Sequence, residues 1–449
     1  MTGTTAKAGK RATYPAYKPS GMDWVGDVPE HWDVRRLKYS ATINDEALPE
    51  TTDPDYEFTY VDIGSVDASK GIVATETYRF EDAPSRARRI VRDGDTIVST
   101  VRTYLRAIAA IRDPEENLIV STGFAVVRPR SLDPGYLSYA LRSPFFVETV
   151  VSRSTGVSYP AINAPEVGKI GVTLPPLDEQ KAIAAFLDRE TSRIDALIEK
   201  KRRQIELLQE KRSALISHAV TKGLDPNAPM KASGIEWLGP VPAHWQVLPI
   251  KRVARMDSGH TPDKKVDEYW TDCTIPWVSL NDTAYLKDHD YIDDTAYHVN
   301  ALGLANSSAH LLPERVVLFT RDATIGLSAI TTRSMAVSQH IIAWICGARI
   351  TPEYLLRVFY SMTQELERLC MGSTIRTLGM PDVLELVTPL PPIEDQRRII
   401  AYLEDEVPML GAVVAKIEES IRLLIEHRSA LISAAVTGKI DLRAEEATP

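Results

Sequence analysis

The segment LPPLDEQKAIAAFLDRETSRIDALIEKKRRQIELLQEKRSALISHAVTKG occupies residues 174–223, and the related LPPIEDQRRIIAYLEDEVPMLGAVVAKIEESIRLLIEHRSALISAAVTGK occupies residues 390–439. Apolar residues recur in both at alternating spacings of four and three, which is the heptad pattern of a coiled-coil seam. The seam positions are Leu187, Thr191, Ile194, Ile198, Lys201, Ile205, Leu208, Arg212, Leu215 and Ala219, then Leu403, Val407, Leu410, Val414, Ile417, Ile421, Leu424, Arg428, Leu431 and Ala435. The sequence therefore predicts two long helices of one design.

Each predicted helix has a recognisable start and end. Acidic residues follow two prolines at both starts and favour the positive helix N-terminus, while Gly223 and Gly438 can provide left-handed stops. Pro408 stands where the first copy has Ser192, and predicts a kink or a restart early in the second helix. About 40 helical residues form a rod of roughly 60 Å that is too thin to be stable alone. We therefore expect the two helices to pair antiparallel, with Arg212 and Arg428 helping to fix the register.

A second repeat precedes each helix by a long interval. Two similar segments align without an insertion: PSGMDWVGDVPEHWDVRRLK at residues 19–38 and ASGIEWLGPVPAHWQVLPIK at residues 232–251. The His-Trp pairs at 31–32 and 244–245 are compatible with a ligand pair or a base-stacking platform. We favour a structural role, in which proline fixes a turn and the indole packs against the domain or the helix end.

The segments between the repeats differ more from one another. Residues 94–100 and 314–320 have the composition of short buried strands, and residues 134–143 and 352–362 have helical patterns. The predicted fold is α/β (α+β), with two related domains separated by two long helices that form an antiparallel coiled coil, in an internal pseudo-two-fold repeat. The expected organisation is a flexible tail at 1–17, a first domain at 18–175, a helix at 176–222, a linker at 223–231, a second domain at 232–390, a helix at 391–437 and a tail at 438–449.

Composition narrows the functional classes. Among 449 residues the net charge is −9, and no apolar run is long enough for a membrane span. The three cysteines lack CxxC spacing, which argues against a zinc site or a disulfide framework and favours a cytoplasmic compartment. No amino-methyltransferase, phosphate-loop or metal-protease motif is present, so we expect no catalytic residue, metal or cofactor. Residues 84–130 nevertheless hold nine arginines against five acids.

Several motifs together resemble one family. They are W-x-G-x-V-P-x-H-W at 24–32 and 237–245, L-P-P-[LI]-[DE]-[DE]-Q at 174 and 390, and R-S-A-L-I-S-x-A-V-T at 212 and 428. In these motifs the chain is similar to the specificity subunits of Type I restriction-modification systems, which defend cells against foreign DNA. The resemblance implies a non-catalytic chain in which each variable domain recognises one half of a split, asymmetric double-stranded DNA sequence, and the coiled coil acts as a ruler. It also implies two modification (methyltransferase) subunits and, in the full complex, two restriction subunits as partners.

The second domain carries a further resemblance at SGHTPDKKVDEYWTDCTIPWVSLND, residues 258–282. This stretch is similar to a common subtype of target recognition domain, whose usual form has glycine where His260 stands. The first domain lacks that start, so the two domains are expected to read different sequences. The alternative for the whole chain is a coiled-coil scaffold or adaptor that binds only proteins, which leaves two divergent domains without a purpose.

Candidate DNA contacts follow from the chemistry of base and phosphate recognition, which uses Arg, Lys, Asn, Gln and hydroxyl side chains. One pair of loops follows predicted strands, and a second pair precedes the Leu-Pro-Pro helix starts. The alternative is that the first are salt-bridged hairpin residues and the second are solvated loops that cap the next helix. The predicted DNA-binding residues are Arg102, Thr103, Tyr104, Arg106, Ser158, Tyr159, Ser258, His260, Thr261, Arg321, Asp322, Thr324, Ser373, Thr374 and Arg376.

Overall fold

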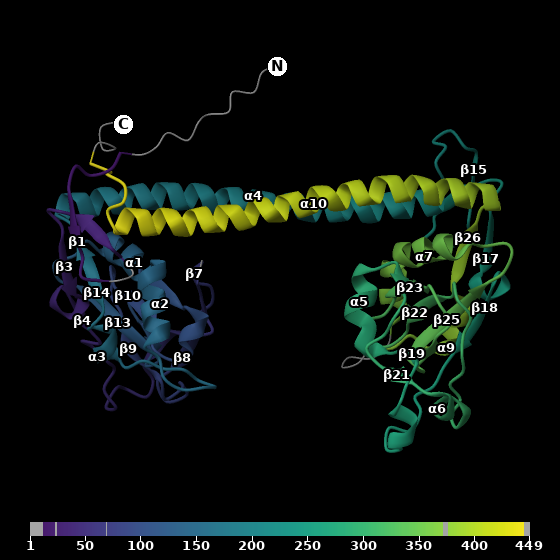
Figure 1. The fold of residues 1–449 in the computed structure, drawn as a ribbon, viewed down its shortest axis with the longest axis horizontal. Helices are drawn as coiled ribbons and strands as arrows, with labels where there is room; N and C mark the ends of the chain where they lie inside the picture. Colours follow the sequence, from purple (N-terminus) through teal and green to yellow (C-terminus); the bar gives the residue numbers. More distant parts are fainter. Residues whose placement is uncertain (1–11, 23–24, 69, 371–375, 444–449) are drawn as a thin grey trace. The chain divides into compact units, whose positions relative to one another are not determined.

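The computed structural model describes residues 12–22, 25–68, 70–370 and 376–443 (Figure 1). The chain divides into two compact units, which we call unit 1 (Met1–Lys201 with Glu419–Pro449) and unit 2 (Arg202–Glu418). The long helices α4 (Leu177–Lys222) and α10 (Ile393–Val436) each contribute one part to either unit. The repeated sequence thus forms two units that are each completed by both helices.

The predicted seam holds the helices together inside each unit. In unit 1, Ile194 and Ile198 of α4 are buried in the same cluster as Leu431 and Ala435 of α10. In unit 2 the ends are exchanged, since the cluster there combines the C-terminal part of α4 with the N-terminal part of α10: Ile216, Ala219, Val220, Ile399, Ile400 and Leu403. The antiparallel pairing expected from the sequence is therefore confirmed.

The two seam arginines differ in their surroundings. Arg428 lies with its Nε 3.1 Å from Oδ1 of Asp195, so this ion pair crosses from α10 to α4 within unit 1. Arg212 is exposed, and the residue that matches Asp195 in the second copy is Gly411, which has no side chain to form the equivalent pair. Only the Arg428 position can therefore help fix the register in the predicted way.

Of the kink or restart predicted at Pro408, the restart does not occur. Helix α10 runs from Ile393 to Val436 through this proline, which is exposed. A proline removes one backbone N–H donor and leaves a carbonyl four residues earlier without its helical partner. On an exposed face water can satisfy that carbonyl, so the helix continues. The stops are as predicted, with φ of 77° at Gly223 and 68° at Gly438.

Unit 1 is built on two four-stranded sheets, of which the first is antiparallel and the second is mixed. The first has the order β11 (Ile108–Ala110), β10 (Thr96–Ser99), β13 (Phe124–Pro129), β4 (Ala41–Ile43), and the second β8 (Glu76–Arg79), β5 (Glu57–Val61), β12 (Leu118–Ser121), β9 (Ala87–Ile90), with β5 and β12 parallel. Short pairs join β1 (Tyr17–Pro19) to β2 (Asp27–Pro29), β3 (Asp33–Arg36) to β14 (Gly171–Leu174) and β6 (Val66–Asp67) to β7 (Gly71–Ile72). The helices are α1 (Pro134–Arg142), α2 (Pro144–Ser152) and α3 (Ala164–Val167).

Unit 2 repeats this plan with a different arrangement of strands. Its larger sheet has the order β18 (Ala254–Ser258), β25 (Ile341–Cys346), β22 (Val317–Thr320), β23 (Ser328–Thr331), β20 (Tyr291–Ile292), and its smaller one β21 (His298–Val299), β19 (Ile275–Val278), β24 (Ala336–Val337). Two pairs join β15 (Met230–Ala232) to β16 (Pro240–Pro242) and β17 (Gln246–Pro249) to β26 (Val387–Leu390). The helices are α5 (Thr283–Asp288), α6 (Ala301–Ala305), α7 (Pro352–Ser361), α8 (Thr363–Leu369) and α9 (Met380–Glu385).

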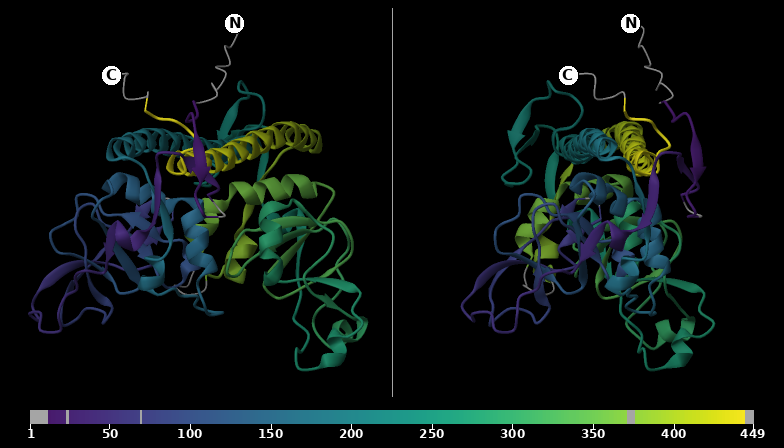
Figure 2. Two further views of the ribbon diagram at one scale, coloured as in Figure 1. Left: turned by 60° about the vertical axis from the view of Figure 1, so that its left-hand side comes forward. Right: turned by 90° about the vertical axis from the view of Figure 1, so that its left-hand side faces the viewer.

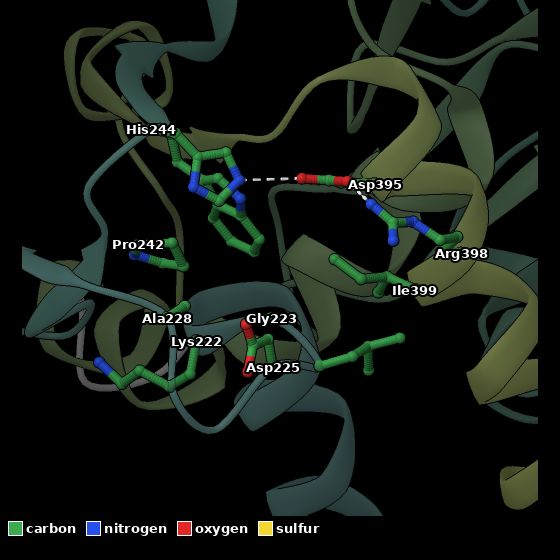
Figure 3. A pocket seen from close by; sticks show the side chains of 11 residues that line it. Lys222, Gly223, Asp225, Ala228, Pro242, His244, Asp395, Arg398 and Ile399 are labelled. Atoms are coloured by element: carbon green, nitrogen blue, oxygen red, sulfur yellow. Dashed lines mark hydrogen bonds and ion pairs between the residues drawn. The ribbon is translucent and has the colours of Figure 1, made fainter.

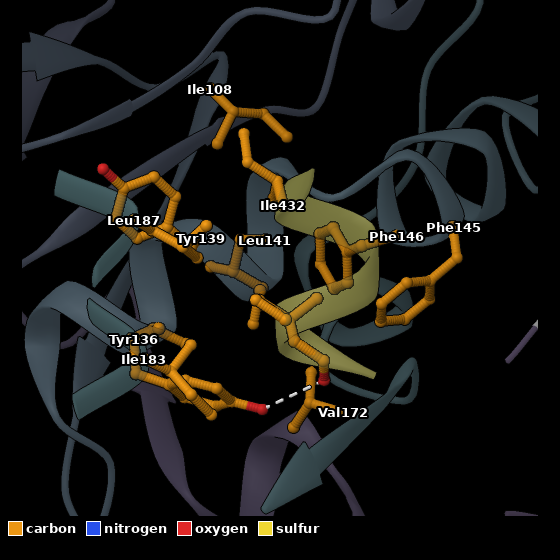
Figure 4. Close-up of a cluster of buried hydrophobic side chains, with 14 of the residues drawn as sticks. Ile108, Tyr136, Tyr139, Leu141, Phe145, Phe146, Val172, Ile183, Leu187 and Ile432 are labelled. Carbon is orange, nitrogen blue, oxygen red and sulfur yellow. Dashed lines mark hydrogen bonds between the residues drawn. The ribbon is translucent and has the colours of Figure 1, made fainter. Parts of the chain in front are cut away.

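In unit 1, helix α1 lies between the sheet that contains β10 and the paired long helices α4 and α10 (Figures 1 and 2), and the buried core shows why. Asp133 caps α1 by accepting from the Tyr136 N–H, and Pro134 suits its first turn. Leu141 of α1 is buried in one cluster with Leu187 and Ile432 of the long helices (Figure 4), and Leu137 belongs to the same cluster. The Tyr136 hydroxyl donates to the Val436 carbonyl, which ties α1 to the end of α10. Helix α7 is placed alike in unit 2, where Tyr354 donates to the Val220 carbonyl of α4.

The His-Trp repeat proves to be a clamp at the start of a long helix. In unit 1, Trp32 is fully buried, and its indole N–H donates to Oε2 of Glu179 in the first turn of α4. His31 Nε2 lies 2.6 Å from Oε1 of the same carboxylate. The structural interpretation of this repeat is therefore confirmed for unit 1, while Trp24 of the same motif lies outside the described residues.

Part of the segment expected to be a flexible tail is packed on unit 1. Tyr14 is 3% exposed, and its hydroxyl donates to Oε2 of Glu179 at 2.9 Å. The Asp441 N–H donates to the Ala12 carbonyl at 2.8 Å, so residues near both ends of the chain meet in this unit. Residues 12–17 are thus ordered by a buried tyrosine, a signal that composition alone does not reveal.

Candidate nucleic-acid interface

The first candidate loop of unit 1 begins where β10 ends. Arg102 adopts a left-handed conformation with φ of 51°, and Arg106 adopts another with φ of 54°. These two turns enclose a short 3-10 helix at Thr103–Leu105 and expose the side chains of Arg102, Tyr104 and Arg106. Left-handed conformation is uncommon for residues other than glycine, so the surrounding contacts must hold this shape.

A second loop supplies those contacts. Val101 forms an isolated β-bridge with Ala161, and the Thr103 hydroxyl donates to the Ser154 hydroxyl at 2.8 Å. The Arg102 guanidinium carbon lies 5.1 Å from the ring centroid of Tyr159, a distance at which cation and aromatic ring attract each other. The sequence treats these loops as separate candidates, and the structure brings them together.

The residues of this paired surface differ in accessibility. Tyr104 is 53% exposed and Tyr159 66% exposed, and Ser158 is also exposed. Thr103 is 2% exposed, and its hydroxyl donates to the Ser154 hydroxyl inside the loop interface, which favours a positioning role. Arg106 is exposed but lies 2.6 Å from Glu148, as the salt-bridged alternative expects.

Unit 2 joins its corresponding loops in the same way. Asp322, two residues after β22, forms a β-bridge with Thr377. The Ala323 N–H donates to the Arg376 carbonyl at 2.9 Å, and the Leu378 N–H donates to the Arg321 carbonyl at 2.8 Å. Arg376 and Thr324 are exposed, whereas Asp322 is 8% exposed. Ser373 and Thr374, predicted to contact DNA from the same loop, lie outside the described residues.

Backbone contacts show which positions of the two units correspond. The Thr100 N–H donates to the Gly123 carbonyl at 2.8 Å, and the Arg321 N–H donates to the His340 carbonyl at 3.0 Å. The residue two positions after each of these donors has a left-handed backbone: Arg102 in unit 1, and Ala323 in unit 2 with φ of 62°. The loops correspond as predicted, but the arginines occupy different positions within them.

The segment at 258–261 lies beside this surface in unit 2. The Thr261 hydroxyl donates to Gln339 Oε1 at 2.7 Å, and the Trp277 indole N–H donates to the His260 carbonyl at 3.2 Å. The Ser258 hydroxyl donates to the Ile341 carbonyl at 3.3 Å. His260 is exposed and is not among the residues with positive φ, so its backbone does not require the glycine that is usual in this motif.

Two polar residues of unit 2 were missed by the sequence prediction. Gln339 and His340 form the turn between β24 and β25, and His340 Nδ1 lies 2.7 Å from Asp322 Oδ2. Gln339 Nε2 lies 3.2 Å from His340 Nε2, so contacts run from Thr261 through this turn to the Asp322 loop. The available signal was a polar Ser-Gln-His run between two apolar strands, a pattern that the corresponding Ser-Thr-Gly run of unit 1 shares.

Several arginines of the segment 84–130 are held in ion pairs. Arg128 lies 2.8 Å from Asp95, Arg92 lies 2.6 Å from Glu46, and Arg112 lies 3.0 Å from Asp188. The hydrogen bond with Asp95 raises the pKa of Arg128 above its ordinary value, although burial opposes the shift. These three arginines are therefore paired with carboxylates, while Arg86, Arg102 and Arg130 of the same segment are exposed.

Comparisons with known proteins find relatives that match most of this chain. A family model described as the Type I restriction modification DNA specificity domain matches residues 29–207 and again residues 242–410. The putative type I restriction enzyme MjaX specificity subunit of Methanocaldococcus jannaschii is 22% identical, with 93% of this chain and 96% of that protein covered. The HindI specificity subunit of Haemophilus influenzae is also 22% identical, with 81% and 90% covered.

Solved structures share the fold. A chain from a structural study of the type I R-M system matches with a TM-score of 0.74 at 23% identity, covering 91% of this chain and 98% of that one. The HsdS subunit from Thermoanaerobacter tengcongensis matches with a TM-score of 0.53 at 23% identity, covering 92% and 98%. In the described part of the chain, no helix has the length and apolarity needed to cross a membrane. Because the family model matches both halves and most of the sequence, the chain belongs to the family of type I restriction-modification specificity subunits.

Proposed function

We propose that the chain reads a split, asymmetric double-stranded DNA sequence, one half with each unit, for a type I restriction-modification complex. The observation that carries this proposal is the joined loop pair, which recurs in both units with different side chains. Loops with the same backbone arrangement but different side chains are suited to recognising different bases in the two half-sites. Membership of the family favours this function over a protein-only scaffold or adaptor.

The side chains of the two surfaces support different base contacts. Unit 1 offers Arg102 beside the exposed rings of Tyr104 and Tyr159. Unit 2 offers a wider polar set that includes amide, imidazole, hydroxyl and guanidinium groups: His260, Thr261, Arg321, Thr324, Gln339, His340 and Arg376. Arg and Gln can form paired hydrogen bonds to guanine and adenine edges in the major groove, while hydroxyls suit phosphates or bases. We assign Thr103 and Asp322 to positioning the loops because both are buried.

The proposed partners supply what this chain lacks. Two modification (methyltransferase) subunits would transfer the methyl groups, and two restriction subunits would complete the full complex. The chain itself would act in the cytoplasm as a non-catalytic subunit without a cofactor. Its net charge of −9 is unfavourable for DNA, so the modification subunits would contribute much of the phosphate attraction. The paired long helices would set the spacing between the two half-sites.

The decisive experiment maps methylated bases. The chain is co-produced with its modification subunits in a host that lacks other DNA methylation, and the genome is sequenced by a method that detects methylated bases. We expect one motif with two defined halves and a fixed internal gap. A culture that produces only the modification subunits is the control and should lack the motif. Equal methylation with and without the chain would contradict the proposal.

A further inference from the structure

The Glu179 site of unit 1 is filled by a phenol ring. The Tyr14 hydroxyl and the Trp32 indole N–H both donate to Glu179 Oε2 at 2.9 Å. The Tyr14 ring stands edge-on to the Trp32 ring with centroids 5.7 Å apart, and its centroid lies 5.5 Å from that of His31. Burial is the main reason that the pKa of Tyr14 is raised, so the hydroxyl stays protonated and keeps donating.

Unit 2 has an open pocket at the corresponding place (Figure 3). The repeats align His244 with His31, Trp245 with Trp32 and Asp395 with Glu179. The pocket has a volume of about 200 Å³. Its lining includes Leu224, Ala228 and Ile399, together with the clamp residues His244, Trp245 and Asp395. In the same alignment, the position of Tyr14 is taken by Asn227, which is exposed and does not line the pocket.

The pocket is lined by an indole N–H that no protein atom in the described residues accepts from. Trp245 is 2% exposed, and within the described ranges no atom accepts a hydrogen bond from its indole N–H. Aspartate is one methylene shorter than glutamate. Its carboxylate is bound by His244 at 3.0 Å and by Arg398, rather than by the indole. The indole N–H is not among the fully buried polar atoms and keeps access to the pocket, so an oxygen brought into the pocket can replace water as its acceptor.

The charges around the pocket are balanced. The lining holds the carboxylates of Asp225 and Asp395 and the cationic groups of Lys222 and Arg398, so its formal charge is zero and it selects neither an anion nor a cation. Leu224, Ile399 and the indole of Trp245 offer apolar contacts. A neutral ring with a hydroxyl suits both parts of this lining, because one hydroxyl can donate to a carboxylate and accept from an N–H.

We propose that the unit 2 pocket binds a tyrosine side chain of a partner protein, with its hydroxyl between Trp245 Nε1 and the Asp395 carboxylate. The partner's tyrosine takes the place that Tyr14 occupies in unit 1. The identification of this partner as a modification subunit rests on the proposed function. The phenol preference of the pocket does not, because it follows from residues of this chain alone.

The first test uses p-cresol, the side chain of tyrosine, as the probe. The full chain is produced with 5-fluorotryptophan, and the fluorine resonance of Trp245 is identified by its loss in Trp245→Phe. We expect p-cresol to shift this resonance saturably, and toluene, which lacks the hydroxyl, to bind at least about ten-fold more weakly. No shift up to the solubility limit of p-cresol would overturn the proposal, and so would an equal response to toluene.

The unit 1 site provides a matched control for the probe. Tyr14→Ala removes the phenol that fills the corresponding place, so p-cresol should then shift the Trp32 resonance of that variant. In the unsubstituted chain the Trp32 resonance should not respond, because Tyr14 occupies the site. A p-cresol concentration that shifts Trp32 in the variant but never shifts Trp245 would show that unit 2 does not bind phenols.

The second test concerns the partner. Ala228 lines the pocket, so Ala228→Phe should fill it with a ring from the chain itself, while Ala228→Ser should leave it open. We expect Ala228→Phe to abolish the p-cresol response and to weaken association with the modification subunit at least about ten-fold, with Ala228→Ser resembling the original chain. Circular dichroism checks that both variants fold.

The outcomes separate the two proposals. Loss of the p-cresol response with unchanged association in Ala228→Phe would show that the partner does not use this pocket, and the proposed function would stand. If the unsubstituted chain fails to bind modification subunits although p-cresol shifts Trp245, the proposed function fails and the phenol pocket remains.

Discussion

The guanidinium carbon of Arg102 lies 5.1 Å from the ring centroid of Tyr159, and this contact joins two loops that are far apart in the sequence of unit 1. The β-bridge between Val101 and Ala161 lies next to it and fixes the backbones. One face of the arginine is thus supported by an aromatic ring. A supported guanidinium loses less conformational freedom when it binds DNA than an unrestrained one.

Arg102→Ala should weaken recognition of one half-site and leave the other unchanged. Loss of a paired contact to a base costs about 1–3 kcal/mol of discrimination. Arg102→Lys should recover only part of this loss, because an ammonium group lacks the planar fork. Competition between DNA duplexes that are altered in one half at a time measures the effect in the assembled complex. Arg35→Ala removes an exposed arginine outside the loops and serves as the control. Equal losses at both half-sites would contradict the assignment.

Arg376→Ala should produce the complementary defect in unit 2. The loop is closed by the Arg376 carbonyl, which accepts from the Ala323 N–H and is unaffected by the substitution. The expected cost is again about 1–3 kcal/mol, now at the other half-site. Arg321→Ala should affect this same half, although its side chain is only 22% exposed. The duplexes used for Arg102 also measure this change, and a defect in the half read by unit 1 would refute it.

Gly259→Ala should destabilise unit 2 strongly. A Cβ at this position would lie 1.7 Å from the Val337 carbonyl oxygen, so the backbone would have to move. We expect a loss of at least about 3 kcal/mol, measured by thermal or urea unfolding. Gly411→Ala in α10 is the matched control, because a Cβ there meets no atom within 4 Å. It should stabilise the helix by roughly 0.5–1 kcal/mol, since alanine is the better helix former.

Asp395 should stabilise unit 2 in a pH-dependent manner. Burial alone would raise the pKa of this carboxyl, but hydrogen bonds from His244 and Arg398 outweigh burial and hold the pKa below its ordinary value. The stabilisation is therefore complete above the unfolded value, near pH 4, and is lost as the pH falls through the folded value. Asp395→Asn should cost about 1–3 kcal/mol at pH 7 and progressively less in acid.

Urea unfolding between pH 7 and pH 3 measures the difference between Asp395→Asn and the original chain. Glu394→Gln changes the neighbouring carboxylate, which is 75% exposed and paired only along the helix surface with Arg397. Its effect should be small at every pH, as is usual for exposed ion pairs. A difference for Asp395→Asn that does not shrink on acidification would contradict the proposed hydrogen bonds.

The long helices were predictable because their information is local. Heptad spacing identifies Ile198 and Leu431 as seam residues, and Gly223 needs only its own left-handed conformation to end a helix. The predicted alternative of a restart at Pro408 is wrong, because the consequence of a proline depends on whether the freed carbonyl is buried, and Pro408 lies on an exposed face. Local sequence patterns therefore predicted the long helices, while the exposure of Pro408 determined that α10 continues through it.

The candidate surface was only partly predictable because its geometry is non-local. The loops around Arg102 and Tyr159 were each proposed, but their contact requires sheet and loop topology that no short pattern encodes. Thr103 was expected at the surface and is buried by the turn before it. Gln339 and His340 were overlooked because a short polar turn between strands usually has no function, and only their contacts toward Asp322 distinguish them.

The left-handed conformation at both Arg102 and Ala323 shows that the backbone shape of this loop does not depend on the side chain at that position. The same backbone geometry carries a long cation in one unit and a methyl group in the other, and backbone hydrogen bonds close both loops. Side chains at these positions can therefore be rewritten without redesigning the frame around them. Under the proposed function, grafting the loop residues of one unit onto the turn of the other should change the DNA half-site that is recognised and leave the folded scaffold as it is.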